Sequence, residues 1–309
     1  MNSATMALQL TCQALGVRGG EIIMPALTFA STGLAAVHNG ARIVFADVDE
    51  DTLCIDWDDA KRKVTPDTKA VIPVWYGGTV APVRHWWPHI PVVEDCAHAA
   101  GSARGSGYYG AACWSFHAVK NLAAGDGGMI TTNDPDLAAR LRRLRWCGID
   151  RSTWGRNLTR YSWEYDIREA GHKAHMNDIT AALALAQLER LDGMNAARRA
   201  IVRRYLEELD GERDWMRLPQ WREDSSWHLF TIRVPAGQRD AFIGHMATAG
   251  VTAGVHYKPL NTYPIFGSAV LPVTDRVWQT LVTLPLYPDM TETDVSRVID
   301  AARTWKGRG

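Results

Sequence analysis

Short apolar segments alternate with helical segments through the first 132 residues, and this alternation limits the chain to few architectures. Each apolar segment has the length of a strand, and each crossover is long enough to return the chain in parallel. The pattern predicts an α/β fold with a mostly parallel sheet covered by helices on both faces. The predicted strands are 21–25, 42–46, 70–74, 90–94, 112–116 and 127–132.

The first helix is predicted over residues 4–15. Asn2 and Ser3 are suited to cap its start, and Gly16 is suited to end it. The N–H groups at such a helix start, beside Ser3 and Thr5, form a ready binding site for an anion. Taken alone, the same residues also describe an ordinary capped helix.

The second half of the chain is predicted to form a smaller α+β domain. A helical pattern starts at Met176, runs to about Asp192 and breaks at Gly193, and a second helix continues to Leu209. This break places the domain boundary between 1–193 and 194–309. The aromatic and arginine-rich stretch 147–172 lacks periodicity and is predicted to be a long functional or interface loop. Further predicted elements are helices at 135–144, 238–250 and from 292 onward, and strands at 228–234 and 252–256.

Composition excludes several classes of partner. Lys plus Arg equals Asp plus Glu, 34 against 34, which gives no reason to expect a nucleic acid or an anionic membrane surface. No apolar run approaches the roughly 20 residues of a membrane span. The five cysteines are odd in number and lack CxxC spacing, so reduced thiols in a cytoplasmic protein are expected, and no metal site is predicted.

Lys120 lies between an apolar run and the glycine-rich turn 125–128, and Asp95 ends an earlier apolar strand. In a parallel sheet, ligands bind at the carboxyl ends of strands. A lysine and an aspartate there form the pair that a pyridoxal phosphate (PLP) site needs, one for a Schiff base and one for the ring nitrogen. A solvated lysine and a helix-capping aspartate are the alternatives. A phosphate-binding NTPase is excluded because no G-x-x-x-x-G-K-[ST] sequence occurs.

An ordered set of motifs resembles the DegT/DnrJ/StrS family of PLP-dependent sugar aminotransferases. The resemblance implies fold type I, with a large PLP-binding domain and a small C-terminal domain. Members usually carry a few dozen residues before the phosphate-binding helix, so a truncated, mis-started or naturally short chain is expected here. The motifs are Pro25-Ala-Leu-Thr-Phe29, Glu94-Asp-Cys-Ala-His-Ala99, Ser115-Phe-His-Ala-Val-Lys-Asn121, Gly125-Asp-Gly-Gly128, Gly254-Val-His-Tyr257 and Leu284-Pro-Leu-Tyr-Pro288.

The resemblance also implies roles for individual residues. Lys120 would hold PLP covalently, and Asp95 would pair with the ring nitrogen. His98 would lie near the phenolic oxygen of the cofactor, where the family has His or Gln, and Phe29 would stack on the ring. The phosphate would be bound by Ala4 (through its backbone), Thr5 and Ser115, and by Lys173 and His175 from a second subunit of a homodimer with shared active sites.

The activity implied by the resemblance is amino transfer from glutamate or glutamine to a nucleotide-linked keto-sugar, with pyridoxamine phosphate (PMP) as the intermediate form of the cofactor. Two alternatives remain at this point, a keto-inositol aminotransferase and a catalytically silent member that serves as a regulatory or assembly partner. Sugar dehydratases of the family carry His where this chain has Lys120, which argues against that activity.

Overall fold

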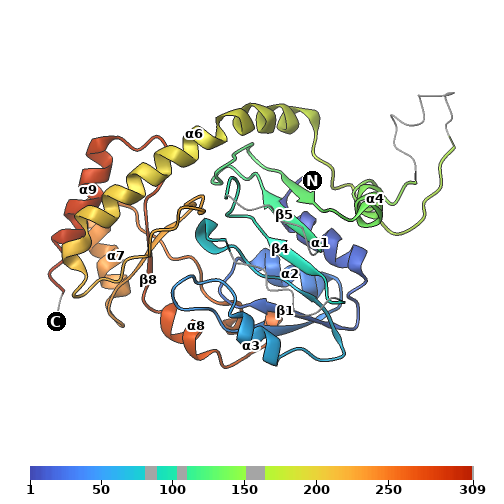
Figure 1. Cartoon of the computed structure of the whole chain (residues 1–309), viewed down its shortest axis with the longest axis horizontal. Helices are drawn as coiled ribbons and strands as arrows, with labels where there is room; N and C mark the ends of the chain where they lie inside the picture. Colours follow the sequence, from blue (N-terminus) through green and yellow to red (C-terminus); the bar gives the residue numbers. More distant parts are fainter. Residues whose placement is uncertain (81–88, 103–109, 151–163, 308–309) are drawn as a thin grey trace.

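The computed structural model describes residues 1–80, 89–102, 110–150 and 164–307, and its larger part is built on a six-stranded sheet (Figure 1). The predicted bounds of the first two strands are confirmed. The strands of this sheet are β1 (Glu21–Pro25), β2 (Arg42–Ala46), β3 (Thr68–Val71), β4 (Val92–Asp95), β5 (Gly110–Ser115) and β6 (Gly128–Thr131).

The strand order is β2-β1-β3-β4-β5-β6, and the first five strands are parallel. The predicted mostly parallel α/β sheet is therefore confirmed. The expected parallel return of the last strand is wrong, because β6 pairs antiparallel with β5, with Ser115 opposite Gly128. Residues 116–127 form turns and no helix, so the chain reverses beside β5 without crossing over.

Helices cover both faces of the sheet, which explains why all of β1 is buried. Ile22 and Met24 lie in the core cluster beneath α1, and Ile23 belongs to the cluster around α3 on the opposite face. The helices of this part are α1 (Ala4–Leu15), α2 (Ala30–His38), α3 (Trp57–Arg62) and α4 (Pro135–Leu144). The predicted first helix is confirmed, with Ser3 as its N-cap and Gly16 in the left-handed conformation at its end.

A single long helix, α6 (Asp178–Glu208), joins the two parts of the molecule (Figure 1). The predicted break at Gly193 is wrong, since the helix passes through this residue without interruption. A glycine costs a helix only about 1 kcal/mol relative to alanine. Leu191, Asn195 and Arg198 are buried on either side of it, and their packing outweighs that cost. The division into 1–193 and 194–309 stays a prediction.

The C-terminal part surrounds a two-stranded antiparallel sheet. The capping box of the last helix is confirmed at Thr291 and Asp294. The strand predicted at 252–256 is wrong, because only one bridge, Gly254 to Thr283, forms there. The elements are β7 (Phe230–Arg233), β8 (Leu281–Leu284), α7 (Arg239–Thr248), α8 (Pro272–Val277) and α9 (Glu292–Arg303). Short 3-10 helices are η1 (Tyr76–Gly78), η2 (Asp210–Glu212), η3 (Leu260–Thr262) and η4 (Pro264–Phe266).

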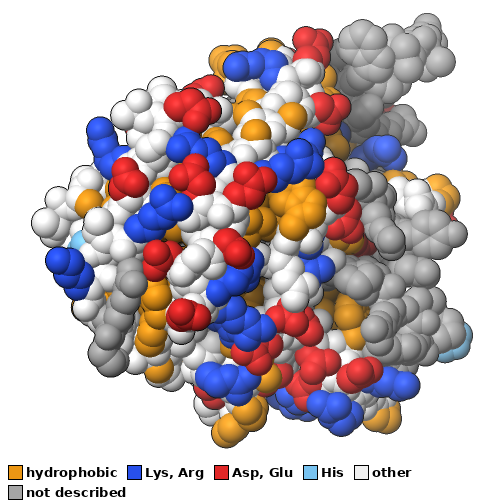
Figure 2. All heavy atoms as spheres, turned by 60° about the vertical axis from the view of Figure 1, so that its left-hand side comes forward, with side chains coloured by type: hydrophobic (Ala, Val, Ile, Leu, Met, Phe, Trp, Pro, Cys, Tyr) orange, Lys and Arg blue, Asp and Glu red, His pale blue; other side chains and the backbone are white. Residues whose placement is uncertain are grey.

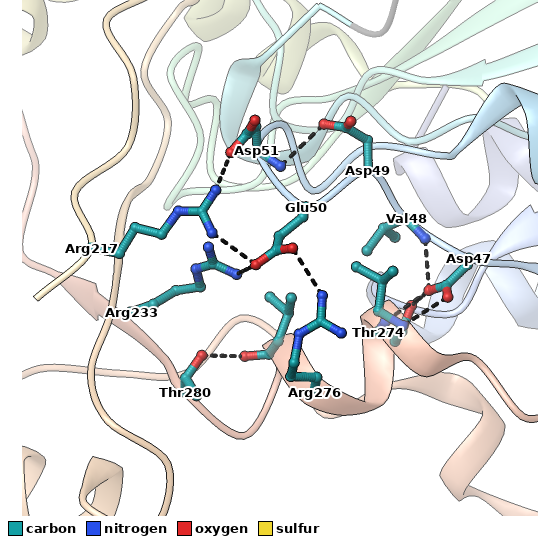
Figure 3. A network of polar contacts seen from close by, with 12 residues as sticks. Asp47, Val48, Asp49, Glu50, Asp51, Arg217, Arg233, Thr274, Arg276 and Thr280 are labelled. Carbon is teal, nitrogen blue, oxygen red and sulfur yellow. Dashed lines mark hydrogen bonds and ion pairs between the residues drawn. The ribbon is translucent and has the colours of Figure 1, made fainter.

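Glu50 ties the loop after β2 to the C-terminal half of the chain (Figure 3). Its carboxylate accepts hydrogen bonds from Arg217 at 2.7 Å, Arg233 at 2.8 Å and Arg276 at 2.8 Å. Nearby, Asp47 accepts hydrogen bonds from the backbone N–H groups of residues 273 and 274 and so caps the start of α8. Two carboxylates of one loop therefore fix the contact between sequence-distant segments.

Glu50→Gln is expected to lower the free energy of unfolding by about 1–2 kcal/mol. Each exposed ion pair contributes up to about 1 kcal/mol, and here one carboxylate serves three guanidinium groups. Urea unfolding at low and high salt measures the loss, which should shrink as salt screens the charges. Glu292→Gln is the control, because that side chain is 93% exposed and pairs with Arg204 alone among the described residues. An unchanged urea midpoint for Glu50→Gln would contradict this view of the junction.

The surface carries both signs of charge. On the face shown in Figure 2, side chains of Lys and Arg are interspersed with those of Asp and Glu. In the part of the chain that the structure describes, no helix is both long enough and apolar enough to cross a membrane.

Candidate active site

A cavity of about 470 Å³ lies where the predicted site residues meet. It brings together Lys120, Asp95, Ala4, Thr5, Phe29, His98 and Ser115, which come from the ends of β4 and β5, the turn after β5 and the starts of α1 and α2. The parallel strands explain this convergence, since their carboxyl ends share one edge of the sheet. The remaining lining residues are Ser3, Leu8, Thr28, Ser31, Val74, Ala97, His117, Val119, Asp126 and Tyr257.

Lys120 lies in the turn that follows β5. The turn is closed by backbone hydrogen bonds, from Lys120 to His117 and from Ala118 to Gly125. Burial lowers the pKa of Lys120 from 10.5 to about 8, and the nearby carboxylate of Asp95 opposes this shift. A measurable fraction of the amine is therefore neutral near pH 7, as a nucleophile requires.

Asp95 is the last residue of β4, and only 5% of it is exposed. One carboxylate oxygen accepts a hydrogen bond from the hydroxyl of Thr32 at 2.8 Å, and the other accepts one from the backbone N–H of Ala97 at 3.1 Å. Burial raises the pKa of Asp95, while these two donors and Lys120 lower it. Among the described residues no cation forms an ion pair with it, so a cationic group in the cavity would be stabilised by this carboxylate.

The start of α1 reaches the cavity because Gly128 lacks a side chain. A Cβ on Gly128 would lie 2.6 Å from the carbonyl carbon of Ser3 and 2.8 Å from the backbone nitrogen of Ala4. The first N–H groups of a helix have no partners within the helix, and together with the helix dipole they favour an anion. Thr5 adds a hydroxyl, which is hydrogen-bonded to Ser31 at 2.6 Å. This end of the cavity is therefore suited to a phosphate group.

Phe29 and His98 complete the set of predicted residues within the cavity. Phe29 precedes α2, and 58% of it is exposed although it is a large apolar side chain. His98 is buried and contacts Tyr257, whose hydroxyl lies 2.9 Å from its Nε2 atom. Exposed apolar surface at a cavity is typical of a ligand contact, and a flat ring at Phe29 suits a planar ligand.

Two predicted site residues do not line the cavity. The ammonium group of Lys173 lies 5.6 Å from the ring centroid of Trp146, and the ring of His175 lies 4.4 Å from the same centroid. Part of the predicted loop 147–172, namely residues 151–163, lies outside the described residues. The contribution of these side chains to a neighbouring subunit stays a prediction.

Three residues at the site, Thr32, Tyr257 and Asn121, were not predicted from the sequence. Thr32 holds Asp95, and Tyr257 holds His98, although each comes from a distant segment. Asn121 follows Lys120 and is fully hydrogen-bonded, donating to Asn195 and Ser226 and contacting His228. The sequence signal for Tyr257 was its place in the block 254–257, and Asn121 was signalled by its position next to the lysine.

Comparison with known proteins agrees with this geometry. A model of the DegT/DnrJ/EryC1/StrS aminotransferase family matches residues 1–303. The structure of the sugar aminotransferase CalS13 from Micromonospora echinospora is similar with a TM-score of 0.88 at 30% sequence identity, over 98% of this chain and 86% of that chain. The structure of the aminotransferase TlmJ from Streptoalloteichus hindustanus is similar with a TM-score of 0.88 at 33% sequence identity, over 98% of this chain and 83% of that chain. The structure of NtdA from Bacillus subtilis, solved with bound cofactor PMP, has a TM-score of 0.87 at 26% sequence identity, over 98% of this chain and 71% of that chain.

Proposed function

The chain belongs to the DegT/DnrJ/EryC1/StrS aminotransferase family of fold type I, PLP-dependent enzymes, and from this premise we propose that it transfers an amino group from glutamate or glutamine to a nucleotide-linked keto-sugar. The expected family, fold type, cofactor and class of enzyme are confirmed by the family match and the similar structures. The single observation that carries the proposal is one cavity that contains Lys120, Asp95 and the start of α1.

The residues of the cavity fit PLP group by group. The start of α1 offers N–H groups and a hydroxyl to the phosphate, Asp95 offers a buried carboxylate to the ring nitrogen, and Phe29 offers a ring to the face of the cofactor. Lys120 offers an amine of lowered pKa to the aldehyde carbon. When bound, PLP supplies an electrophilic carbon that binds amines covalently and a protonated ring that takes up electrons.

In this proposal, the side chains of the chain hold the reactants and move protons. Lys120 would hold the cofactor through its Nζ atom and, when that amine is free, would carry a proton between the two carbon atoms that are both bonded to the transferred nitrogen. Asp95 keeps a proton on the ring nitrogen, and Thr32 orients Asp95 by its hydrogen bond. The burial of Asp95 and Thr32 keeps water away from the hydrogen bond between them.

The donor and the acceptor are tested in separate half-reactions with purified, PLP-loaded protein. Glutamate or glutamine should convert the cofactor to its amino form and yield the corresponding oxo acid, whereas alanine and aspartate should react far more slowly. A nucleotide-linked keto-sugar should then restore the starting spectrum, and the free keto-sugar and a keto-inositol should not. Rapid restoration by the keto-inositol alone would overturn the proposed acceptor.

We also infer that the protein acts as a homodimer in the cytoplasm. The N-terminal half of α6 carries large apolar side chains at the surface, Ile179, Leu183, Leu185 and Leu188, of which the first is 79% exposed. Ile179 and Leu183 lie one turn apart on one side of the helix, and Leu185 and Leu188 lie on another side. Exposed apolar surface of this kind is suited to pack against a second copy about a two-fold axis. The five free cysteines support a reducing compartment.

Mixing two inactive variants is expected to restore activity if active sites are shared between subunits. Lys120→Ala lacks the reactive amine, and Lys173→Ala/His175→Ala lacks the groups predicted to reach the phosphate in the partner. After subunit exchange, half of the dimers contain one intact site, so about a quarter of the wild-type activity should return.

The assay requires that each variant alone is inactive and that exchange is shown by mixed dimers of differently tagged chains. Each variant alone, taken through the same exchange procedure, is the control. If mixed dimers form but remain inactive, all essential groups lie within one chain.

A further inference from the structure

The chain just before β7 lies against three loops of the larger part of the molecule. The backbone N–H of His228 donates to the carbonyl oxygen of Gly77 at 2.9 Å, in the loop after β3. The hydroxyl of Ser226 donates to the carbonyl oxygen of His98 at 3.0 Å, in the loop after β4. The carbonyl oxygen of Ser226 accepts from the side chain of Asn121 at 2.8 Å, in the turn after β5. One short segment therefore binds the loops that follow three neighbouring parallel strands.

The side-chain amide of Asn121 is the centre of these contacts, and only 3% of this residue is exposed. Its nitrogen donates to Oδ1 of Asn195 at 2.7 Å and to the carbonyl oxygen of Ser226 at 2.8 Å. Its oxygen lies 2.9 Å from Nδ1 of His228. Burial and the nearby Lys120 hold the pKa of His228 well below its usual value, so the ring is neutral and carries its hydrogen at Nδ1. All three hydrogen bonds thus fix one orientation of the amide.

These bonds hold the turn that carries Lys120 from one side. Residues 117–119, which precede Lys120 in the turn, are exposed, whereas Asn121 is buried. Asn195 lies on α6 and is itself held, since its amide donates to the carbonyl oxygen of Ala100 at 3.0 Å. Consecutive Cα atoms lie about 3.8 Å apart, so a shift of residue 121 moves the backbone of the lysine with it.

The burial that this position gives to Lys120 determines the charge of its amine. Burial lowers the pKa of Lys120 to about 8, and the carboxylate of Asp95 opposes this shift. Burial also lowers the pKa of the imidazoles of His98, His228 and His256 around the amine, so these rings are neutral near pH 8. Two further titratable side chains of the cavity wall, His117 and Asp126, are exposed. A turn that moved toward solvent would therefore raise the pKa of Lys120.

We propose that Asn121 is a positioning residue, which binds the turn after β5 to α6 and to the chain before β7 and so keeps the amine of Lys120 buried. The C-terminal half of the chain then acts on the reactive amine through a single amide. The inference rests on the proposed role of Lys120 as that amine. Its test needs no PLP, amino donor or sugar, so a wrong substrate would leave the result unchanged.

The test measures the pKa of Lys120 in the full-length protein freed of PLP. Acetic anhydride reacts with neutral amines, so labelling of Lys120 is followed by peptide mass spectrometry across the pH range in which lysines titrate. The exposed Lys69 is the internal standard. The midpoint of the pH curve reports the pKa, and the plateau at high pH reports access of the reagent.

Asn121→Ala is expected to raise this midpoint from about 8 by about one pH unit or more, because water reaches the amine once the turn is released. The neutral fraction near pH 7 would then fall about tenfold. The substitution changes no charge, so the shift reports burial. A folded Asn121→Ala protein whose midpoint stays within about 0.3 units of wild type would reduce Asn121 to a structural role and overturn the proposal.

Asn39→Ala is the matched control. Its amide also donates to two carbonyl oxygens, those of Gln9 at 3.0 Å and Ala35 at 2.8 Å, but it joins α2 to α1 and does not line the cavity. The midpoint of Lys120 should not change in this variant. An equal rise in both variants would show that any loosening of the fold exposes the lysine, which would overturn the specific role of Asn121.

Two variants of His228 decide the question from the other side, even if Asn121→Ala does not fold. His228→Leu removes one of the three bonds and should raise the midpoint by about half a unit or more. His228→Asn places an amide N–H near the position of Nδ1, so it should keep the wild-type midpoint. Equal midpoints in these two variants would show that the bond to Asn121 does not position the lysine.

Discussion

Lys120→Ala is expected to abolish amino transfer and the visible absorbance that covalently held PLP gives, while the fold remains intact. Acid–base catalysis alone contributes about 10²–10⁴-fold, and this variant also loses the amine that holds the cofactor, so turnover should fall by more than about 10⁴-fold. The measurement is turnover with the proposed donor and acceptor, beside the absorbance spectrum of the PLP-loaded protein.

Lys69→Ala is the control for this prediction, since Lys69 is an exposed lysine of β3 and should be dispensable. Unchanged circular dichroism and thermal unfolding would show that the Lys120 variant folds. Undiminished turnover in Lys120→Ala would remove the lysine from the mechanism.

Asp95→Asn is expected to lower turnover by about 10- to 100-fold with the cofactor still bound. The amide keeps the shape of the side chain and can still accept from Thr32 and Ala97, but it no longer holds a proton on the ring nitrogen. Hydrogen bonds to charged groups contribute about 1.5–3 kcal/mol, which corresponds to factors of about 10 to 100 in rate.

Steady-state kinetics and the content of bound PLP are measured on the same preparation of Asp95→Asn. Asp126→Asn is the matched control, because Asp126 also lines the cavity but is exposed and accepts a bond from its neighbour Gly127. Turnover near the wild-type value in Asp95→Asn, with full cofactor content, would make Asp95 a structural residue only.

Local signals in the sequence were sufficient for several elements of the fold. The bounds of α1 follow from the side chain of Ser3 at one end and the left-handed glycine at the other. Features that depend on distant contacts were not predicted. The direction of β6 depends on a turn without a helix, and the continuity of α6 through Gly193 depends on buried residues around it. The helix α8 begins at Pro272 and is capped by Asp47, far away in the sequence.

The residues of the site also fall into these two groups, those with a local signal in the sequence and those whose role depends on distant contacts. Lys120, Asp95 and Ser115 were predicted because each lies at or just after the carboxyl end of a strand of one sheet, and their common cavity results from the parallel order of those strands. Tyr257 and Thr32 could not be assigned roles from the sequence, because their partners are fixed only once the chain folds. The roles of Lys173 and His175 depend on a second subunit, which no pattern within one chain can place.

The most direct test of the central claim is to reduce the PLP-loaded protein with borohydride and locate the modified residue by peptide mass spectrometry. Reduction converts a covalent link between cofactor and amine into a permanent label. The account predicts one cofactor per chain, attached to Lys120, with no label on the other lysines and none in Lys120→Ala. A label on a different lysine, or a loaded protein that reduction leaves unmodified, would contradict it.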